Sequence, residues 1–268
     1  MANALKKIEE TNKLPAYLEE DQTGEGLSHS ADDLLRPMAR VLQPMSPEVE
    51  KKGSSYVPGA EPGKILIKNT PLAPIDGDTG FVFQHCQSTS AVVEWVPRMK
   101  GGGGGQGFVA SHPVKTASEV PGAKQTEDPL NPGRKIWVNG ATGNWLVETR
   151  YVAGLLYQDG QSFPIGIPFS STGHTVFKAF QTLMSYQTNS KGQQLNSYAG
   201  LYRVKTKLRT KGSQSWYVLE FSNDGPNGAF RAATPEEYQR GKAFAEALKK
   251  MTIDHSAVAE TSTDDDSM

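Results

Sequence analysis

Alternating apolar and polar positions recur along the middle of the chain and predict a mostly β fold. Residues 81–95, FVFQHCQSTSAVVEW, read as two strands, because apolar side chains alternate in the first half and crowd the second half. An Asn-Gly pair at Asn139 and an Asp-Gly pair at Asp159 are flanked by strand formers, which indicates a meander of hairpins over residues 135–170. Residues 113–135 show no periodicity and are expected to form a mobile loop.

Helical periodicity occurs twice in the second half of the chain. In TGHTVFKAFQTLMSYQT, residues 172–188, apolar side chains recur at helical spacing from Val176 onward. In TPEEYQRGKAFAEALKKM, Thr234 is expected to cap a helix that has Pro235 at its first position, acids in its first turn and lysines in its last. The expected fold class is therefore mainly β (α+β), with one mid-chain helix and a C-terminal helix.

The charges are strongly segregated, although the formal net charge of the 268 residues is only -1. No Asp or Glu occurs from Gly160 to Leu219, a stretch that carries seven Lys and Arg residues. The first 36 residues hold eight acids, and the last 15 hold five acids with no Lys or Arg. Acidic ends and a basic middle indicate a polyanionic partner for the middle of the chain.

The remaining composition favours a cytoplasmic location, in the host cell if a phage encodes the chain. Cys86 is the single cysteine, so no disulfide can form within the chain, and a reducing compartment suits it. The first 21 residues contain no apolar core of a signal peptide, and no run of 18 apolar residues occurs anywhere. We therefore expect no membrane association.

A basic residue occupies every second position in GLYRVKTKLRTKGSQSWY, residues 200–217. Side chains of a strand alternate between faces, so these cations are expected on one face, roughly 6–7 Å apart, which is near the phosphate spacing of an extended single strand. Nearby aromatic rings could stack on bases of any sequence. The alternative is an ordinary solvated face. The predicted DNA-binding residues are Arg203, Lys205, Lys207, Arg209, Lys211, Trp216, Tyr217, Tyr202, Arg98 and Lys100.

A hairpin turn at Lys211-Gly212 would pair the basic strand with SQSWYVLEFS. Because neighbouring residues of a strand face opposite ways, only one of Trp216 and Tyr217 can share the face of the cations. We expect Tyr217 on the cation face and Trp216 in the core.

The chain offers no convincing catalytic constellation. The glycine tract at 101–105 formally contains G-x-G-x-x-G, but an extended segment follows it instead of the helix that a dinucleotide site needs. It is either a flexible hairpin tip or a loop whose backbone approaches phosphates beside Arg98 and Lys100. His85 and Cys86 are interpreted as core residues, because the other histidines are scattered singly. We predict no enzymatic activity, no cofactor and no metal.

Several motifs between Asp33 and Phe221 carry a resemblance to a known family. They are DLLRPMARVLQPMSPEV followed by GAEPGKIL, VEWVPR and GGGGGQGFVASH, WLVETRYVAGLLYQDG, PFSSTGHTVFKAFQTL, and LYRVKTKLRTKGSQSWYVLEF. In this order they resemble a family of bacteriophage proteins described as single-stranded DNA-binding proteins. The resemblance implies an OB-like β-barrel and a non-catalytic role in phage DNA replication or recombination.

The tail AVAETSTDDDSM resembles the acidic tails of single-stranded DNA-binding proteins, which recruit replication partners. The resemblance assigns this partner-binding role to Asp264, Asp265 and Asp266, although those tails often end in an aromatic residue and this one ends in Met268. A merely solubilising tail is the alternative, and a homo-oligomer is possible.

The expected organisation has five parts: a disordered acidic arm (1–30), a short helix and linker (31–58), a β-rich OB-like nucleic-acid-binding domain (59–232), a C-terminal helix (233–253) and an acidic disordered tail (254–268). Three alternatives stay open for the function. They are a structural or virion-associated phage protein, a regulator that binds a host protein, and an unrecognised hydrolase.

Overall fold

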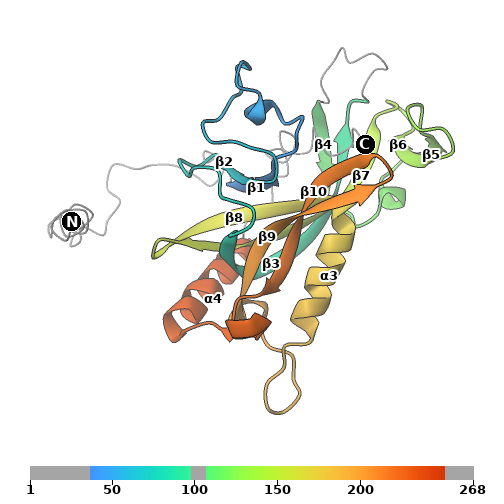
Figure 1. Cartoon of the computed structure of the whole chain (residues 1–268). Helices are drawn as coiled ribbons and strands as arrows, with labels where there is room; N and C mark the ends of the chain where they lie inside the picture. Colours follow the sequence, from blue (N-terminus) through green and yellow to red (C-terminus); the bar gives the residue numbers. More distant parts are fainter. Residues whose placement is uncertain (1–36, 98–106, 251–268) are drawn as a thin grey trace, which may run out of the picture. The chain divides into compact units, whose positions relative to one another are not determined.

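The computed structural model describes residues 37–97 and 107–250. Eleven strands form one sheet, and seven of them follow the order β10-β9-β3-β7-β8-β1-β2 (Figure 1). The strands are β1 (Met38–Val41), β2 (Ile65–Lys68), β3 (Phe81–Trp95), β4 (Phe108–His112), β5 (Ala123–Glu127), β6 (Lys135–Asn139), β7 (Trp145–Gln158), β8 (Gln161–Ser170), β9 (Gly200–Lys211), β10 (Gln214–Asn223) and β11 (Arg231–Ala232). The helices are α3 (Gly173–Ser185) and α4 (Pro235–Lys250).

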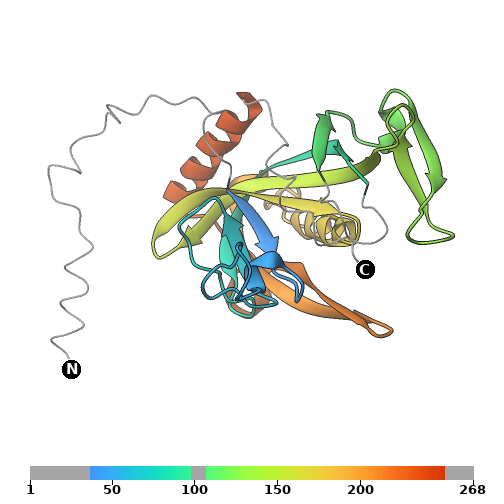
Figure 2. The same cartoon turned by 90° about the horizontal axis from the view of Figure 1, so that it is seen from above.

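The sheet is mixed and curls strongly into a half-barrel (Figure 2). Its pairs are antiparallel except for β1 and β8, which run parallel where Met38 faces Gly166. The curl brings strands together that are far apart in the strand order, since the side chain of Gln43, just after β1, bonds to the backbone of Tyr217 in β10. The predicted fold class, a mainly β, barrel-like sheet with two helices, is confirmed.

The two helices cover opposite faces of the sheet. Phe83 and Gln84 are neighbours in β3 and point to opposite sides. The ring of Phe83 packs near Phe180 of α3, with ring centroids 6.5 Å apart. The amide of Gln84 instead donates to the main-chain carbonyl of Glu237 in α4, at 3.0 Å. The main hydrophobic core therefore lies between α3 and the sheet, and Phe180 is its central ring.

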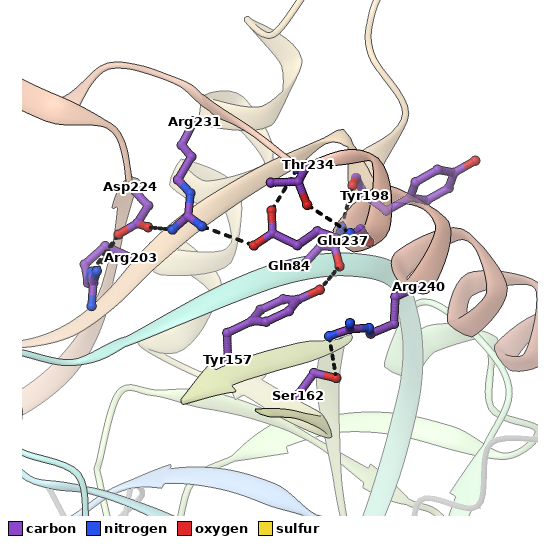
Figure 3. A network of polar contacts seen from close by, with 10 residues as sticks. All are labelled: Gln84, Tyr157, Ser162, Tyr198, Arg203, Asp224, Arg231, Thr234, Glu237 and Arg240. Carbon is purple, nitrogen blue, oxygen red and sulfur yellow. Dashed lines mark hydrogen bonds and ion pairs between the residues drawn. The ribbon is translucent and has the colours of Figure 1, made fainter. Parts of the chain in front are cut away.

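Polar contacts fasten α4 to the sheet (Figure 3). Tyr157 donates its hydroxyl hydrogen to the carbonyl oxygen of the Gln84 side chain at 2.7 Å, which orients the amide toward α4. Gly241 faces this amide so closely that a Cβ atom there would lie 2.6 Å from its nitrogen. The Thr234 hydroxyl accepts from the backbone N–H of Glu237, and the Glu237 carboxylate accepts from that of Thr234. The predicted cap is thus confirmed as a capping box.

Three segments differ from their expected structure. Residues 81–95 form one strand of 15 residues instead of two, because β7 pairs along their length and a bulge between His85 and Gln87 absorbs the irregularity. Residues 113–135 are not a loop: a short 3-10 helix (Ala117–Glu119) buries Ala117, and β5 pairs with β6. β1 lies in the segment expected to be a helix and linker.

One of the two predicted turns of the meander, at Asp159, is confirmed, whereas Asn139 ends β6 and residues 140–144 form a longer loop to β7. Asp159 and Gly160 both have positive φ angles, 50° and 77°, as a two-residue turn between β7 and β8 requires. No helix in the ranges 37–97 and 107–250 is long and apolar enough to cross a membrane.

Candidate nucleic-acid interface

Strands β9 and β10 form a regular antiparallel hairpin. Their pairing runs without interruption from Lys211 and Gln214 to Tyr202 and Asn223. The turn consists of Gly212 and Ser213, one residue later than expected, and Gly212 has a φ of 62° that favours glycine. Because no bulge interrupts the pairing, side chains alternate faithfully along both strands.

The five basic side chains of β9 therefore lie on one face of the hairpin, as the strand pattern predicted. Directly opposed residues of an antiparallel pair point to the same side of the sheet. The register places Trp216 opposite Arg209, Val218 opposite Lys207 and Glu220 opposite Lys205. We call this surface the cation face; it consists of Arg203, Lys205, Lys207, Arg209 and Lys211 with their β10 partners.

The register reverses our assignment of the two aromatic residues. Trp216 shares the cation face, whereas Tyr217 stands opposite Leu208 on the other face. A Cβ atom added at Gly63 would lie 2.7 Å from the Tyr217 ring, so that ring rests on the glycine. The expectation that Tyr217 shares the cation face is wrong, because a two-residue turn pairs odd positions of β9 with even positions of β10.

Tyr202 also lies away from the cation face. Its side chain is buried, with only 2% of its surface exposed, and its ring stands edge-on to Phe180 at a centroid distance of 5.0 Å. Tyr202 thus belongs to the core beneath α3, and the prediction that it contacts DNA is wrong, because its ring has no free surface on which a base could stack.

Acidic residues neutralise part of the basic strand. The Arg203 guanidinium contacts Asp224 at 2.7 Å, and Arg231 contacts the other oxygen of the same carboxylate at 2.6 Å (Figure 3). The Lys207 ammonium lies 2.8 Å from the Glu220 carboxylate. The stretch from 160 to 219 contains no acid, but Glu220 in β10 and Asp224, directly after β10, lie beside the basic strand once the chain has turned back.

Three cations of the hairpin stay available to an external anion. Lys205, Arg209 and Lys211 form no ion pair with any residue that the structure describes, and all three are exposed. Two of them, Arg209 and Lys211, lie at the tip beyond Lys207. The available positive charge is therefore concentrated in the distal part of the hairpin.

Side chains and loops hold the hairpin where it leaves the core. The Gln43 amide donates to the carbonyl of Tyr217 at 2.8 Å and accepts from its N–H at 2.9 Å, in the manner of a neighbouring strand. Thr206 donates its hydroxyl hydrogen to Gly63 at 2.7 Å and its N–H to Gly77 at 2.9 Å. Beyond these contacts every residue from 207 to 215 is exposed, so the hairpin projects as an arm (Figure 2).

A small hollow lies beside the hairpin, between β1, β10 and the start of α3. Its volume is about 70 Å³, room for two or three water molecules. Arg40 lines it, but the guanidinium contacts the buried carboxylate of Glu48 at 3.1 Å. Because the hollow is small and its cation is paired, the hairpin is the stronger candidate interface.

His85 and Cys86 lie in the core, as interpreted from the sequence. Burial lowers the pKa of His85 to about 4 and raises the pKa of the Cys86 thiol to about 12, so both side chains are neutral at pH 7. Among the described residues, no group of three His, Cys, Asp or Glu side chains is placed to hold a metal ion.

A buried carboxylate that no local sequence pattern indicates lies at the end of β3. Glu94 is 3% exposed and accepts hydrogen bonds from Asn144 at 2.8 Å, from Thr142 and from Asn139, and lies 3.1 Å from His112. Burial alone would raise its pKa, but these hydrogen bonds hold the pKa below its usual value. Since both oxygens are bonded, Glu94 ties the turn between β6 and β7 to β3, and it has no free acceptor for a substrate.

Several predicted site residues lie outside the described part of the chain. They are Arg98, Lys100, the glycine tract at 101–105, and the tail residues Asp264, Asp265 and Asp266. Their roles stay predictions.

Comparisons with known proteins identify a phage family. The model of that family, described as Pam3 phage gp34-like protein, matches residues 8–254. No curated protein and no solved structure matches the chain. Because the matched range covers most of the 268 residues, the chain belongs to the Pam3 phage gp34-like protein family.

Proposed function

We propose that this phage protein binds single-stranded DNA on the cation face of the β9–β10 hairpin and acts in DNA replication or recombination without catalysing a reaction. One observation carries the proposal: Lys205, Arg209 and Lys211 are exposed, share one face and have no acidic partner in the described structure, and Trp216 stands directly opposite Arg209. Sequence-independent binding of a single strand requires two elements, cations that contact the phosphates and an aromatic ring on which bases stack.

The geometry suits an extended strand. Residues two apart in β9 are separated by roughly 6–7 Å, close to the spacing of phosphates along an extended nucleic acid backbone. The arm projects from the sheet, so a strand could approach its cation face without displacing other parts of the described structure. A two-stranded β ribbon can also enter the major groove of duplex DNA, which makes duplex the necessary competitor in a test.

The deciding experiment is a titration of a fluorescently labelled single-stranded oligonucleotide, with unlabelled single strand and duplex of the same sequence as competitors. We expect the single strand to compete better than duplex, and to compete equally well for several base compositions. Binding should weaken as salt rises, with about 0.7 added to the log–log slope for each phosphate contacted. A salt-insensitive homo-oligomer that ignores DNA would favour a structural virion role instead.

The same titration includes a chain that ends before Asp264. We propose that the acidic tail recruits replication or recombination proteins and competes with DNA for the cation face, because a local polyanion is attracted to the same charges. The truncated chain should then bind the oligonucleotide more tightly at low salt. Equal binding by the two chains would show that the tail does not compete with DNA for the cation face.

The two aromatic residues of the hairpin are expected to respond differently to substitution. Trp216→Ala should weaken oligonucleotide binding by about 1–3 kcal/mol, because it removes the stacking surface of the cation face. Tyr217→Ala should lower the free energy of unfolding by about 1–3 kcal/mol, because its ring packs against Gly63. Binding isotherms and urea unfolding of both variants separate the two effects.

Trp216→Phe is the matched control, since it keeps a ring that can stack. It should retain most of the affinity. Trp216 is also partly buried against the main core. If Trp216→Ala lowers stability without lowering affinity, Trp216 acts as a core residue and not as a stacking surface for DNA.

A further inference from the structure

Glu220 is the one acidic residue of the paired strands β9 and β10, and it lies within the cation face. Its carboxylate oxygen lies 2.8 Å from the Lys207 ammonium, diagonally across the hairpin, and its backbone position is directly opposite Lys205. Both members of the ion pair are accessible to solvent, with 57% of the Lys207 side chain and 50% of the Glu220 side chain exposed.

This pair differs in kind from the other ion pair of the strand. Asp224 is 4% exposed in its side chain and is held by both Arg203 and Arg231, so separating it from Arg203 would leave a buried carboxylate with only one of its two cationic partners. The Lys207–Glu220 pair is exposed, and exposed pairs of this type contribute little to stability. Lys207 can therefore exchange its partner at small energetic cost, whereas Arg203 cannot.

We infer that Glu220 competes with phosphate for Lys207 and thereby limits how tightly the cation face holds a nucleic acid strand. A carboxylate and a phosphate oxygen use the same hydrogen-bond donors of an ammonium group. Binding therefore gains only the difference between the interaction free energy of Lys207 with phosphate and that of Lys207 with Glu220. In the bound state the displaced carboxylate also repels the phosphate nearest Lys205. The inference rests on the proposed function and names the residue that regulates it. A protein that must release DNA to other proteins benefits from such a limit.

Glu220→Gln tests the inference, with Glu246→Gln as the matched control. Both variants remove one negative charge, and Glu246 is an exposed residue of α4 outside the hairpin. At about 0.1 M salt we expect Glu220→Gln to bind a labelled oligo-dT about three- to tenfold more tightly than wild type. Its log–log salt slope should steepen by about 0.7, the contribution of one additional phosphate contact. Glu246→Gln should bind as wild type does.

A double-mutant cycle identifies Lys207 as the partner. Lys207→Gln should cost less affinity in the wild-type background, where the ammonium must leave Glu220 before it can contact phosphate, than in the Glu220→Gln background. In the Glu220→Gln background it should remove the whole gain. Non-additivity of this kind is expected for residues in direct contact and not for a general change in net charge.

The outcomes separate this inference from the proposed function. If wild type binds no single strand at low salt, the proposed function fails and the inference falls with it. If wild type binds but Glu220→Gln binds equally or more weakly, the inference alone is overturned. The same holds if Lys207→Gln costs the same in both backgrounds, or if Glu246→Gln reproduces the gain.

Discussion

Replacing Lys205, Arg209 and Lys211 together by glutamine is expected to weaken single-strand binding about 100-fold at roughly 0.1 M salt. Each phosphate contact contributes about 0.7 to the slope of log affinity against log salt. Three contacts therefore change the logarithm of the affinity by about two between 0.1 M and 1 M salt, where ionic attraction is largely screened. The three side chains are exposed and carry no ion pair within the described residues, so folding should be unaffected.

The matched control moves the same loss of charge to α4. Lys242, Lys249 and Lys250 are exposed residues of that helix, and replacing all three by glutamine lowers the net charge by the same amount. This variant should keep its affinity within about threefold of wild type, because only long-range attraction is lost. An equal loss in both triple variants would assign binding to net charge and not to the hairpin.

Acid should destabilise the protein through His85 by about 3 kcal/mol. The ordinary pKa of histidine is 6.5, and burial of His85 against Phe180 lowers its pKa to about 4 in the folded protein. Its Nε2 lies 2.8 Å from the Ser88 hydroxyl, and its Nδ1 has no hydrogen-bond partner among the described residues. No charged group among these contacts favours the imidazolium.

The free energy of unfolding falls with falling pH because the protein takes up a proton at His85 when it unfolds. Between pH 6.5 and pH 4 the unfolded chain binds a proton at this histidine and the folded protein does not. The free energy of unfolding therefore keeps the full contribution of neutral His85 above pH 6.5 and loses it as the pH falls toward 4. A difference of about 2.5 pKa units at about 1.4 kcal/mol per unit gives the expected loss.

Urea unfolding at a series of pH values from 7 to 4.5 measures this loss. His85→Leu should lose less stability than wild type over this range, and the difference should be about the contribution of His85, since the variant has no group to protonate at this position. The Ser88 hydroxyl would keep its hydrogen bond from the Gln181 amide, at 2.9 Å. If wild type and His85→Leu lose stability in parallel, other groups take up the protons; His85→Gln repeats the comparison if the leucine variant does not fold.

Local signals in the sequence were sufficient for the elements whose structure depends on neighbouring residues. The Asp159-Gly160 turn, the cap at Thr234 and the periodicity from Val176 each depend on a few adjacent side chains, and each is found as predicted. The basic strand and its single charged face followed from the alternation of side chains along a strand.

Features that depend on strand partners could not be predicted in this way. The polar middle of residues 81–95 suggested a break, but pairing with β7 supplies the hydrogen bonds that keep β3 continuous. The capture of Arg203 by Asp224 and of Lys207 by Glu220 requires the hairpin register, which a shift of the turn by one residue would change. Gln43 contacts Tyr217 across 174 positions of the chain, and no local pattern indicates such a contact.

Contact between the cation face of the hairpin and the phosphates of a single strand should be visible in the salt dependence of binding. The most direct test compares the salt dependence of wild type and of the Lys205, Arg209 and Lys211 triple glutamine variant on the same labelled oligonucleotide. The log–log slope of the variant should be smaller by about two, and the two affinities should converge near 1 M salt. Two parallel lines, with the same slope at every salt concentration, would show that these side chains do not contact phosphates and would rule out the cation face as the DNA-binding surface.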